Sequence, residues 1–131
     1  GTASLNVDGG TTPEMSISAG NVVFDAQTDV NGELNINAAQ SMKVLVGAAP
    51  FFPGTQDHII VITAHAAVDV TLPTAPAQGR IYTIRNAAGG VAIVAAGGTD
   101  TIEGQPQVNL ANGATARFVY GGGGIWYNVG N

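Results

Sequence analysis

Residues 68–131 decide the fold, and they read VDVTLPTAPAQGRIYTIRNAAGGVAIVAAGGTDTIEGQPQVNLANGATARFVYGGGGIWYNVGN. Short runs of alternating or β-branched apolar residues are separated by glycine, proline and asparagine turns. An alternation of period two is typical of a strand with one buried face, and no segment shows helical periodicity over about 11 residues. The stretch therefore predicts an all-β fold.

The same signals divide residues 56–131 into a series of short strands. The continuous apolar run HIIVIT at 58–63 is typical of a strand buried on both faces. Further strands are expected at 68–72, 80–86, 91–94, 108–110, 114–120 and 125–129, and 101–104 is expected to be a brief strand or a corner. The segments 87–90 and 112–113 are predicted to be hairpin turns. Residues 51–131 are therefore expected to form a compact antiparallel β-sandwich or jelly-roll-like head.

Residues 1–50 carry a weaker version of this pattern. Apolar residues occur in pairs two positions apart, such as Val22 with Phe24, between glycine-containing turns. The Asn31-Gly32 dipeptide predicts a hairpin that joins 22–28 to 33–37. Strands that bury so little area are weak alone, and they usually stack in repeats or wind with other chains. Residues 1–50 are therefore expected to form a β-rich shaft or collar segment.

A boundary between the two segments is predicted at 48–54, which holds two prolines, one glycine and the adjacent Phe51 and Phe52. Prolines remove ladder donors and favour turns. Two adjacent aromatic residues are too apolar for a solvated linker, so one of them is expected to plug the base of the head. The chain opens at Gly1 without methionine, so it is expected to be a fragment or a processed form.

The composition favours assembly and excludes several classes of function. The 20 alanines and 19 glycines predict a thin core, which oligomerisation would supplement. The net charge is −5, and the four basic residues form no cluster that would neutralise the phosphates of nucleic acid or hold an anionic membrane. The chain has no cysteine and no apolar run of about 18 residues, so disulfides and a spanning helix are excluded.

Chemistry-bearing residues are few, and the chain is expected not to be an enzyme. His58 and His65 are seven positions apart, so they lie on opposite faces of a continuous strand and cannot easily bind one metal ion together. In a trimer, three copies of one histidine could surround an axial metal ion. Asp100 and Glu103 can approach each other at a corner as glycosidase carboxylates do, but Asp100 is more typical of a turn cap. Gly121–Gly124 lacks the Lys-Ser/Thr pair and the helix of a phosphate loop. No catalytic, cofactor-binding or metal-binding residue is predicted.

Aromatic residues are the remaining candidates for contact with a ligand or a second chain. On the last strand Tyr127 shares a face with Ile125 and Val129, and Trp126 lies on the other, so one of the two rings is expected at the periphery. An exposed ring is a candidate sugar platform or interface anchor, and for Trp126 packing into a trimer interface is favoured. The candidate ligand or interface residues are Trp126, Tyr127, Tyr120, Tyr82, Arg80 and Gln78.

The order of the motifs adds a resemblance. The chain reads T-L-P at 71–73, G-R-I-Y-T-I-R-N at 79–86, D-T-I-E-G at 100–104, N-G at 112–113 and I-W-Y at 125–127. Over roughly residues 57–131 this resembles the C-terminal domain of many phage tail-fibre and minor structural proteins. The chain departs from that pattern at Arg85, where lysine is frequent, and at the tetraglycine 121–124. The resemblance implies a trimeric, β-structured virion appendage whose head contacts the host surface.

The predicted function is that of a structural virion protein, a tail-fibre or spike tip that attaches to the host cell surface as a multivalent homotrimer. The loops 74–79, 87–90 and 121–124 are the expected contacts for a host receptor or glycan. The alternatives are a purely architectural trimerisation domain of a virion appendage and a secreted carbohydrate-binding β-sandwich module. No nucleic acid, membrane insertion or cofactor is expected, and the location is the virion, or the extracellular space for a secreted module.

Overall fold

A computed structural model describes residues 41–130. This part of the chain contains strands and turns and no helix. The strands are β1 (Lys43–Ala48), β2 (Asp57–Ala64), β3 (Val70–Leu72), β4 (Ile81–Asn86), β5 (Ala92–Ala96), β6 (Thr101–Ile102), β7 (Gln107–Leu110), β8 (Thr115–Tyr120) and β9 (Ile125–Gly130). The all-β prediction is confirmed for these residues. The shaft or collar predicted at 1–50, with its Asn31-Gly32 hairpin, lies outside them except for 41–50.

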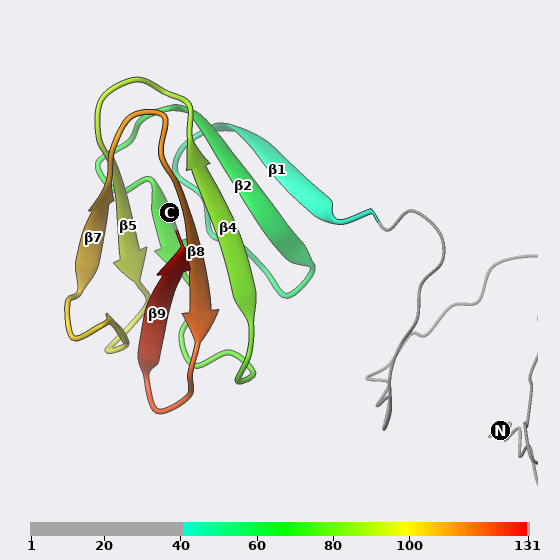
Figure 1. The fold of residues 1–131 in the computed structure, drawn as a ribbon, viewed down its shortest axis with the longest axis vertical. Helices are drawn as coiled ribbons and strands as arrows, with labels where there is room; N and C mark the ends of the chain where they lie inside the picture. The colour runs from blue at the N-terminus through cyan, green and yellow to red at the C-terminus, as the bar shows by residue number, and fades with distance from the viewer. Residues whose placement is uncertain (1–40, 131) are drawn as a thin grey trace, which may run out of the picture. The chain divides into compact units, whose positions relative to one another are not determined.

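The strands form two sheets (Figure 1). The larger sheet has the order β1-β2-β4-β8-β9-β6, and the smaller sheet has the order β3-β5-β7. Strands β1, β2 and β4 run parallel to one another, as do β3 with β5 and β6 with β9. Strand β8 is antiparallel to β4 and β9, and β5 is antiparallel to β7. The sheets are therefore mixed, which corrects the expectation of an antiparallel sandwich.

Most connections carry the chain from one sheet to the other. Strands β2, β4, β6 and β8 lie in the larger sheet, and β3, β5 and β7, which alternate with them along the chain, lie in the smaller one. The hairpins predicted at 87–90 and 112–113 are therefore wrong, because these segments are corners from β4 to β5 and from β7 to β8. Strands β2 and β4, which are separated along the chain by β3 of the smaller sheet, lie next to each other in the larger sheet and run parallel.

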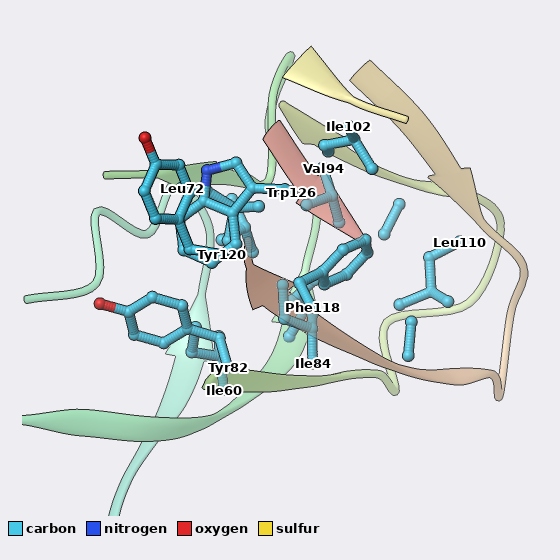
Figure 2. Packing of buried hydrophobic residues seen from close by; sticks show 14 residues of the cluster. Ile60, Leu72, Tyr82, Ile84, Val94, Ile102, Leu110, Phe118, Tyr120 and Trp126 are labelled. Atoms are coloured by element: carbon cyan, nitrogen blue, oxygen red, sulfur yellow. The ribbon is translucent and has the colours of Figure 1, made fainter. Parts of the chain in front are cut away.

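The core lies between the two sheets, and Figure 2 shows its packing. Fourteen apolar side chains are buried there: Ile60, Ile62, Val70, Leu72, Tyr82, Ile84, Ala92, Val94, Ile102, Leu110, Ala116, Phe118, Tyr120 and Trp126. The period of two places Tyr82 and Ile84 inside and Thr83 toward the outside of β4. Strand β2 was predicted to be buried on both faces, but only its inner residues are fully buried, while Ile59 and Val61 are half-buried.

Strand β1 is part of the larger sheet of the head. It pairs in parallel with β2, so residues 43–48 of the predicted 1–50 segment lie in this sheet. An ion pair of 2.9 Å between Lys43 Nζ and Asp57 Oδ1 ties the two strands together where both begin. The pKa of Asp57 is lowered, first by the hydrogen bond with Lys43 and then by the hydrogen bond from the Gly54 N–H.

The connection from β1 to β2 runs along the edge of the smaller sheet. The Phe51 N–H donates to the Asp69 carbonyl over 2.8 Å, and the Phe51 carbonyl accepts from the Thr71 N–H over 3.0 Å. The Phe51 ring packs against the core, whereas Phe52 is 72% exposed. Of the two phenylalanines, Phe51 is the one that packs into the head.

Asn86 joins the two corners that replace the predicted hairpins. Its side chain is fully buried, and its Nδ2 donates to the carbonyls of Leu110 over 2.9 Å and Gly90 over 3.1 Å. Its Oδ1 accepts from the Ala88 N–H over 3.1 Å. Its backbone carbonyl accepts from Gly113 over 2.9 Å. One residue at the end of β4 therefore holds both crossings between the sheets.

Replacing Asn86 is expected to destabilise the fold strongly. Asn86→Ala leaves the buried Leu110 carbonyl and the partly buried Gly90 carbonyl without this donor and opens a cavity, so the free energy of unfolding should fall by about 2–4 kcal/mol. Denaturant titration followed by Trp126 fluorescence at fixed protein concentration measures this. Asn109→Ala, at an exposed position of β7, is the matched control and should change stability by less than about 0.5 kcal/mol. Equal effects of the two variants would contradict the role given to Asn86.

Candidate functional site

Two of the three predicted contact loops lie together at one end of the head, and the third lies at the other end (Figure 1). The Gly79 N–H donates to the Tyr120 carbonyl over 2.8 Å, which joins the 74–79 loop to the end of β8. A Cβ atom on Gly122 would lie 3.6 Å from Gln78 Cδ, so this side chain reaches the 121–124 turn. The 87–90 corner lies at the opposite end of β4. These three loops therefore do not form one continuous binding surface on one head.

Three buried aromatic rings support the end that holds 74–79 and 121–124. The Trp126 ring centroid lies 5.8 Å from that of Tyr82 and 5.2 Å from that of Tyr120 (Figure 2). The Tyr82 hydroxyl donates to the Gly54 carbonyl over 2.8 Å, and the Tyr120 hydroxyl accepts from the Gly124 N–H over 2.9 Å. The rings fill the core and their hydroxyl groups position the backbone of two connecting segments.

Arg80 fixes the connection that leads into β2, which Tyr82 also contacts. Its guanidinium carbon lies 5.0 Å from the Tyr82 ring centroid, and its Nη2 donates to the carbonyls of Asp57 over 2.6 Å and Gly54 over 3.1 Å. A guanidinium over an aromatic face is attracted by the ring quadrupole. Arg80 therefore holds the start of β2 against the start of β4, which is a positioning role.

The predicted site residues divide into two groups. Trp126, Tyr82 and Tyr120 are 0%, 1% and 5% exposed, so the structure places them in the core of one chain. This corrects the expectation that Trp126 packs into a trimer interface, because its ring is enclosed by contacts within the head. Tyr127 is 44% exposed and Gln78 is exposed, so both can still meet a ligand or a second chain.

A cleft of about 320 Å³ opens beside the 74–79 loop. Its lining is mostly apolar and consists of Pro53, Gly54, Thr55, Pro73, Thr74, Pro76, Ala77, Arg80 and Tyr82. The volume is at the small end of the range for ligand pockets. The polar groups of Arg80 and Tyr82 are engaged with Gly54 there, so few convergent donors remain for a ligand.

The side of the larger sheet that faces away from the core is apolar, and we call it the outer face. Six large apolar residues that are 43–64% exposed lie on it: Met42, Val44, Val46, Ile81, Tyr127 and Val129. Strand register places them in rows, since Val44 pairs with Ile59, Val46 with Val61, and Ile81 with Val119, which pairs with Tyr127. A shallow groove of about 630 Å³ on this face is lined by Met42, His58, Ile59, Gly79, Arg80, Ile81, Thr83 and Arg117.

The opposite end of the head holds a buried carboxylate. Asp69 is 1% exposed, and it accepts from the N–H groups of Ile93 over 2.7 Å and Ala66 over 3.0 Å. His65 Nδ1 lies 3.0 Å from Asp69 Oδ1. Burial by itself raises the pKa of Asp69, but these hydrogen bonds outweigh burial, and the net pKa is lowered.

No group of three or more histidine, aspartate or glutamate residues within 41–130 is placed to hold a metal ion. Asp100 is buried and its Oδ2 accepts from the Ala75 N–H over 2.7 Å, so this carboxylate caps the backbone of a distant loop. Glu103 is exposed at the turn that follows β6.

Sequence reasoning missed Asp69 and Asn86. In V-D-V the aspartate has the position of an outward residue, but β3 begins only at Val70, so Asp69 turns inward at a corner. Asn86 ends a run that looked like the first arm of a hairpin. For Asn86 the available signal was a polar residue directly before a glycine-containing segment, whereas Asp69 precedes the apolar residues of β3 and offered no such signal.

Comparison with known proteins gives no relative. No family model matches the chain, and neither a curated protein nor a solved structure matches it. Residues 41–130 contain no helix with the length and apolar character needed to cross a membrane.

Loss of the Asp100 contact is expected to loosen the 74–79 loop selectively. Ala75 has a φ of 43°, a left-handed conformation that disfavours alanine, and Asp100 holds its N–H. Asp100→Ala should lower the free energy of unfolding by about 1–2 kcal/mol and accelerate amide exchange most at 74–79. Ala75→Gly is the matched variant, and it should be neutral or stabilising by up to about 1 kcal/mol because glycine accepts this φ. Hydrogen exchange read by mass spectrometry measures both, and uniform acceleration across the head would contradict the local role.

Proposed function

We propose that this chain forms the homotrimeric head of a virion appendage of the tail-fibre or spike type, and that the appendage attaches the virion to the host cell surface. The observation that carries the proposal is the outer face, where six large apolar side chains are half exposed on one side of the larger sheet. Several large exposed apolar side chains gathered on one face are typical of interaction sites in soluble proteins.

A second copy of the chain is the occupant that best fits the outer face. The head is small, and alanine supplies two members of its buried core, so the apolar area buried within one chain is modest. The face reaches the edge of the sheet at β1, where Val44 and Val46 are 47% and 64% exposed. Among the nearby polar residues are Thr83, Arg85 and Arg117. Of the four carboxylates in residues 41–130, Asp57 lies on a strand of this sheet, where it is buried and paired with Lys43. A closed ring of copies would cover both the apolar patch and the strand edge.

The assignment to a virion appendage is supported by the order of sequence motifs. The segments T-L-P, G-R-I-Y-T-I-R-N and D-T-I-E-G fall on β3, β4 and β6 or on the connections next to them. The tail-fibre domains that this sequence resembles carry their motifs in the same order along the chain. This is the argument for a virion location and for three copies.

Attachment would be made by the loops at the two ends of the head. The 74–79 and 121–124 loops form one candidate contact surface with Gln78 between them, and the 87–90 corner forms another. A trimer would present each surface three times, so weak individual sites would act together.

A purely architectural trimerisation domain is the second candidate, and one observation favours it. Three of the four candidate aromatic anchors are buried, so Tyr127 is the one that remains exposed, and it lies on the proposed interface. A head of this kind would hold copies together and leave attachment to another part of the appendage.

A charge on the outer face is expected to dissociate the assembly. The wild-type molar mass in solution should be near three times 13.1 kDa, and Val46→Glu should reduce it to that of one chain because an unpaired carboxylate resists burial. Light scattering on a sizing column measures the mass. Val91→Glu is the matched control, since Val91 is similarly exposed at 55% but precedes β5 in the smaller sheet. A wild-type monomer, or a Val46→Glu protein that stays trimeric, would contradict the proposed interface.

Substitutions in the loops are expected to distinguish a head that attaches to cells from a purely architectural head. Gln78→Ala together with Ala77→Asp alters exposed positions of the 74–79 loop, so binding of the labelled protein to a panel of bacterial cells should fall by at least about tenfold through lost avidity. The molar mass should remain that of the wild-type protein. Unchanged cell binding by this variant, and by one altered at Ala87 and Ala88, would favour the architectural role.

A further inference from the structure

His65 stands between two groups that can only accept a hydrogen bond. Its Nδ1 lies 3.0 Å from Asp69 Oδ1, and its Nε2 is in hydrogen-bonding contact with the Gly89 carbonyl oxygen. Asp69 is 1% exposed at its side chain, and His65 is 28% exposed. The ring therefore connects Asp69, which directly precedes β3, to Gly89, in the middle of the corner from β4 to β5.

The two contacts demand two protons on the ring. A neutral imidazole carries one N–H and one lone pair, whereas the imidazolium ion donates from both nitrogens. If the ring loses a proton while it keeps the bond to Asp69, the lone pair of Nε2 faces the lone pairs of the Gly89 oxygen. That contact is then repulsive, and the ring or the corner has to move.

The middle of the corner has little other support. Ala87 and Ala88 are held by the Ile62 carbonyl and by Asn86 Oδ1, and Gly90 is held through its carbonyl by Asn86 Nδ2. In the described part of the chain, the Gly89 carbonyl oxygen contacts His65 Nε2. Gly89 and Gly90 have φ values of 75° and 71°, so this is a segment of glycine backbone that can change conformation at low cost.

We infer that His65 is a protonation-controlled latch of the 87–90 corner: the imidazolium ion holds the Gly89 carbonyl against Asp69, and loss of one proton releases the middle of the corner. The Ala88 N–H and the Gly90 carbonyl stay held by Asn86, so the change is centred on Gly89. The latch does not rest on the proposed function. If the 87–90 corner contacts a host surface, the latch makes that contact depend on pH.

The electrostatic surroundings of His65 are simple. Asp69 is the titratable side chain in contact with it, the end of β2 contributes Thr63 and Ala64, and the 87–90 corner contributes no charge. Arg85, on β4, directs its guanidinium to the Gly113 carbonyl and the Thr115 hydroxyl instead.

The direction of the pH dependence follows from the raised pKa of His65. The Gly89 carbonyl is the largest cause of the raised pKa, and the hydrogen bond with Asp69 is the second. A histidine whose pKa is raised in the folded protein stabilises the fold fully below its ordinary value of about 6.5, and this stabilisation is lost as the pH rises through the folded-state value. The latch is therefore closed in mildly acidic solution and opens as the pH rises through the folded-state pKa of His65, which is raised above its ordinary value.

Nuclear magnetic resonance on the full chain tests the latch directly. The ring nitrogens of ¹⁵N-labelled His65 should titrate with a midpoint above 6.5, and both should carry protons below it. The backbone amide shifts of Ala88–Val91 should follow the same midpoint. Amides of the 74–79 loop at the other end of the head should not change with that midpoint.

Matched variants of the two histidines complete the test. His65→Gln should abolish the pH transition of the Ala88–Val91 amides, and His58→Gln should leave it unchanged because His58 lies at the opposite end of β2. A transition that persists in His65→Gln would overturn the inference. So would a wild-type protein in which His65 titrates while the corner amides stay constant, and that measurement stands even if His65→Gln does not fold.

Discussion

The buried side chain of Asn86 is the contact on which the two-sheet arrangement depends. It ends β4 in the larger sheet and reaches the carbonyls of Leu110 and Gly90, which belong to the corners entering and leaving the smaller sheet. Amide groups of this kind satisfy backbone atoms that neither sheet can pair, because a corner has no neighbouring strand. An apolar residue of similar size would fill the space and leave those carbonyls unpaired, so polar complementarity and not volume sets the requirement at this position.

The strands were largely predictable from the sequence, but their partners were not. Period two located the strands at 80–86, 114–120 and 125–129 to within one or two residues, because alternate burial is a local property of each strand. Glycine-rich segments such as 87–90 were read as hairpins, although the same residues suit a corner between sheets equally well. A glycine indicates that the backbone adopts a positive φ, but it does not indicate with which strand the next segment pairs. That choice is made by distant contacts such as those of Asn86 and Asp69.

The candidate site was also predictable only in part. Alternation on β9 required one of Trp126 and Tyr127 to point inward, and the structure settles which one: Trp126 packs on Tyr82 and Tyr120, while Tyr127 lies over Gly121. A Cβ atom on Gly121 would come within 2.4 Å of the Tyr127 ring, so the glycine makes room for that ring. The buried Asp69 and its histidine were not predictable, because their partners Ile93 and Gly89 lie more than 20 positions further along the chain.

The alternation of strands between the sheets also governs how the head acquires its structure. Ile60 pairs with Ile84 and Val70 with Val94, each across 24 positions, and β8–β9 is the one antiparallel pair of neighbouring strands closed by a short turn within residues 41–130. Loop-closure entropy has to be overcome before most pairings form, so folding is expected on a timescale of about milliseconds to seconds. During that interval the open strand edges of one copy are available to another. Dilute, cool conditions should therefore favour recovery of native protein over aggregates when the chain is refolded.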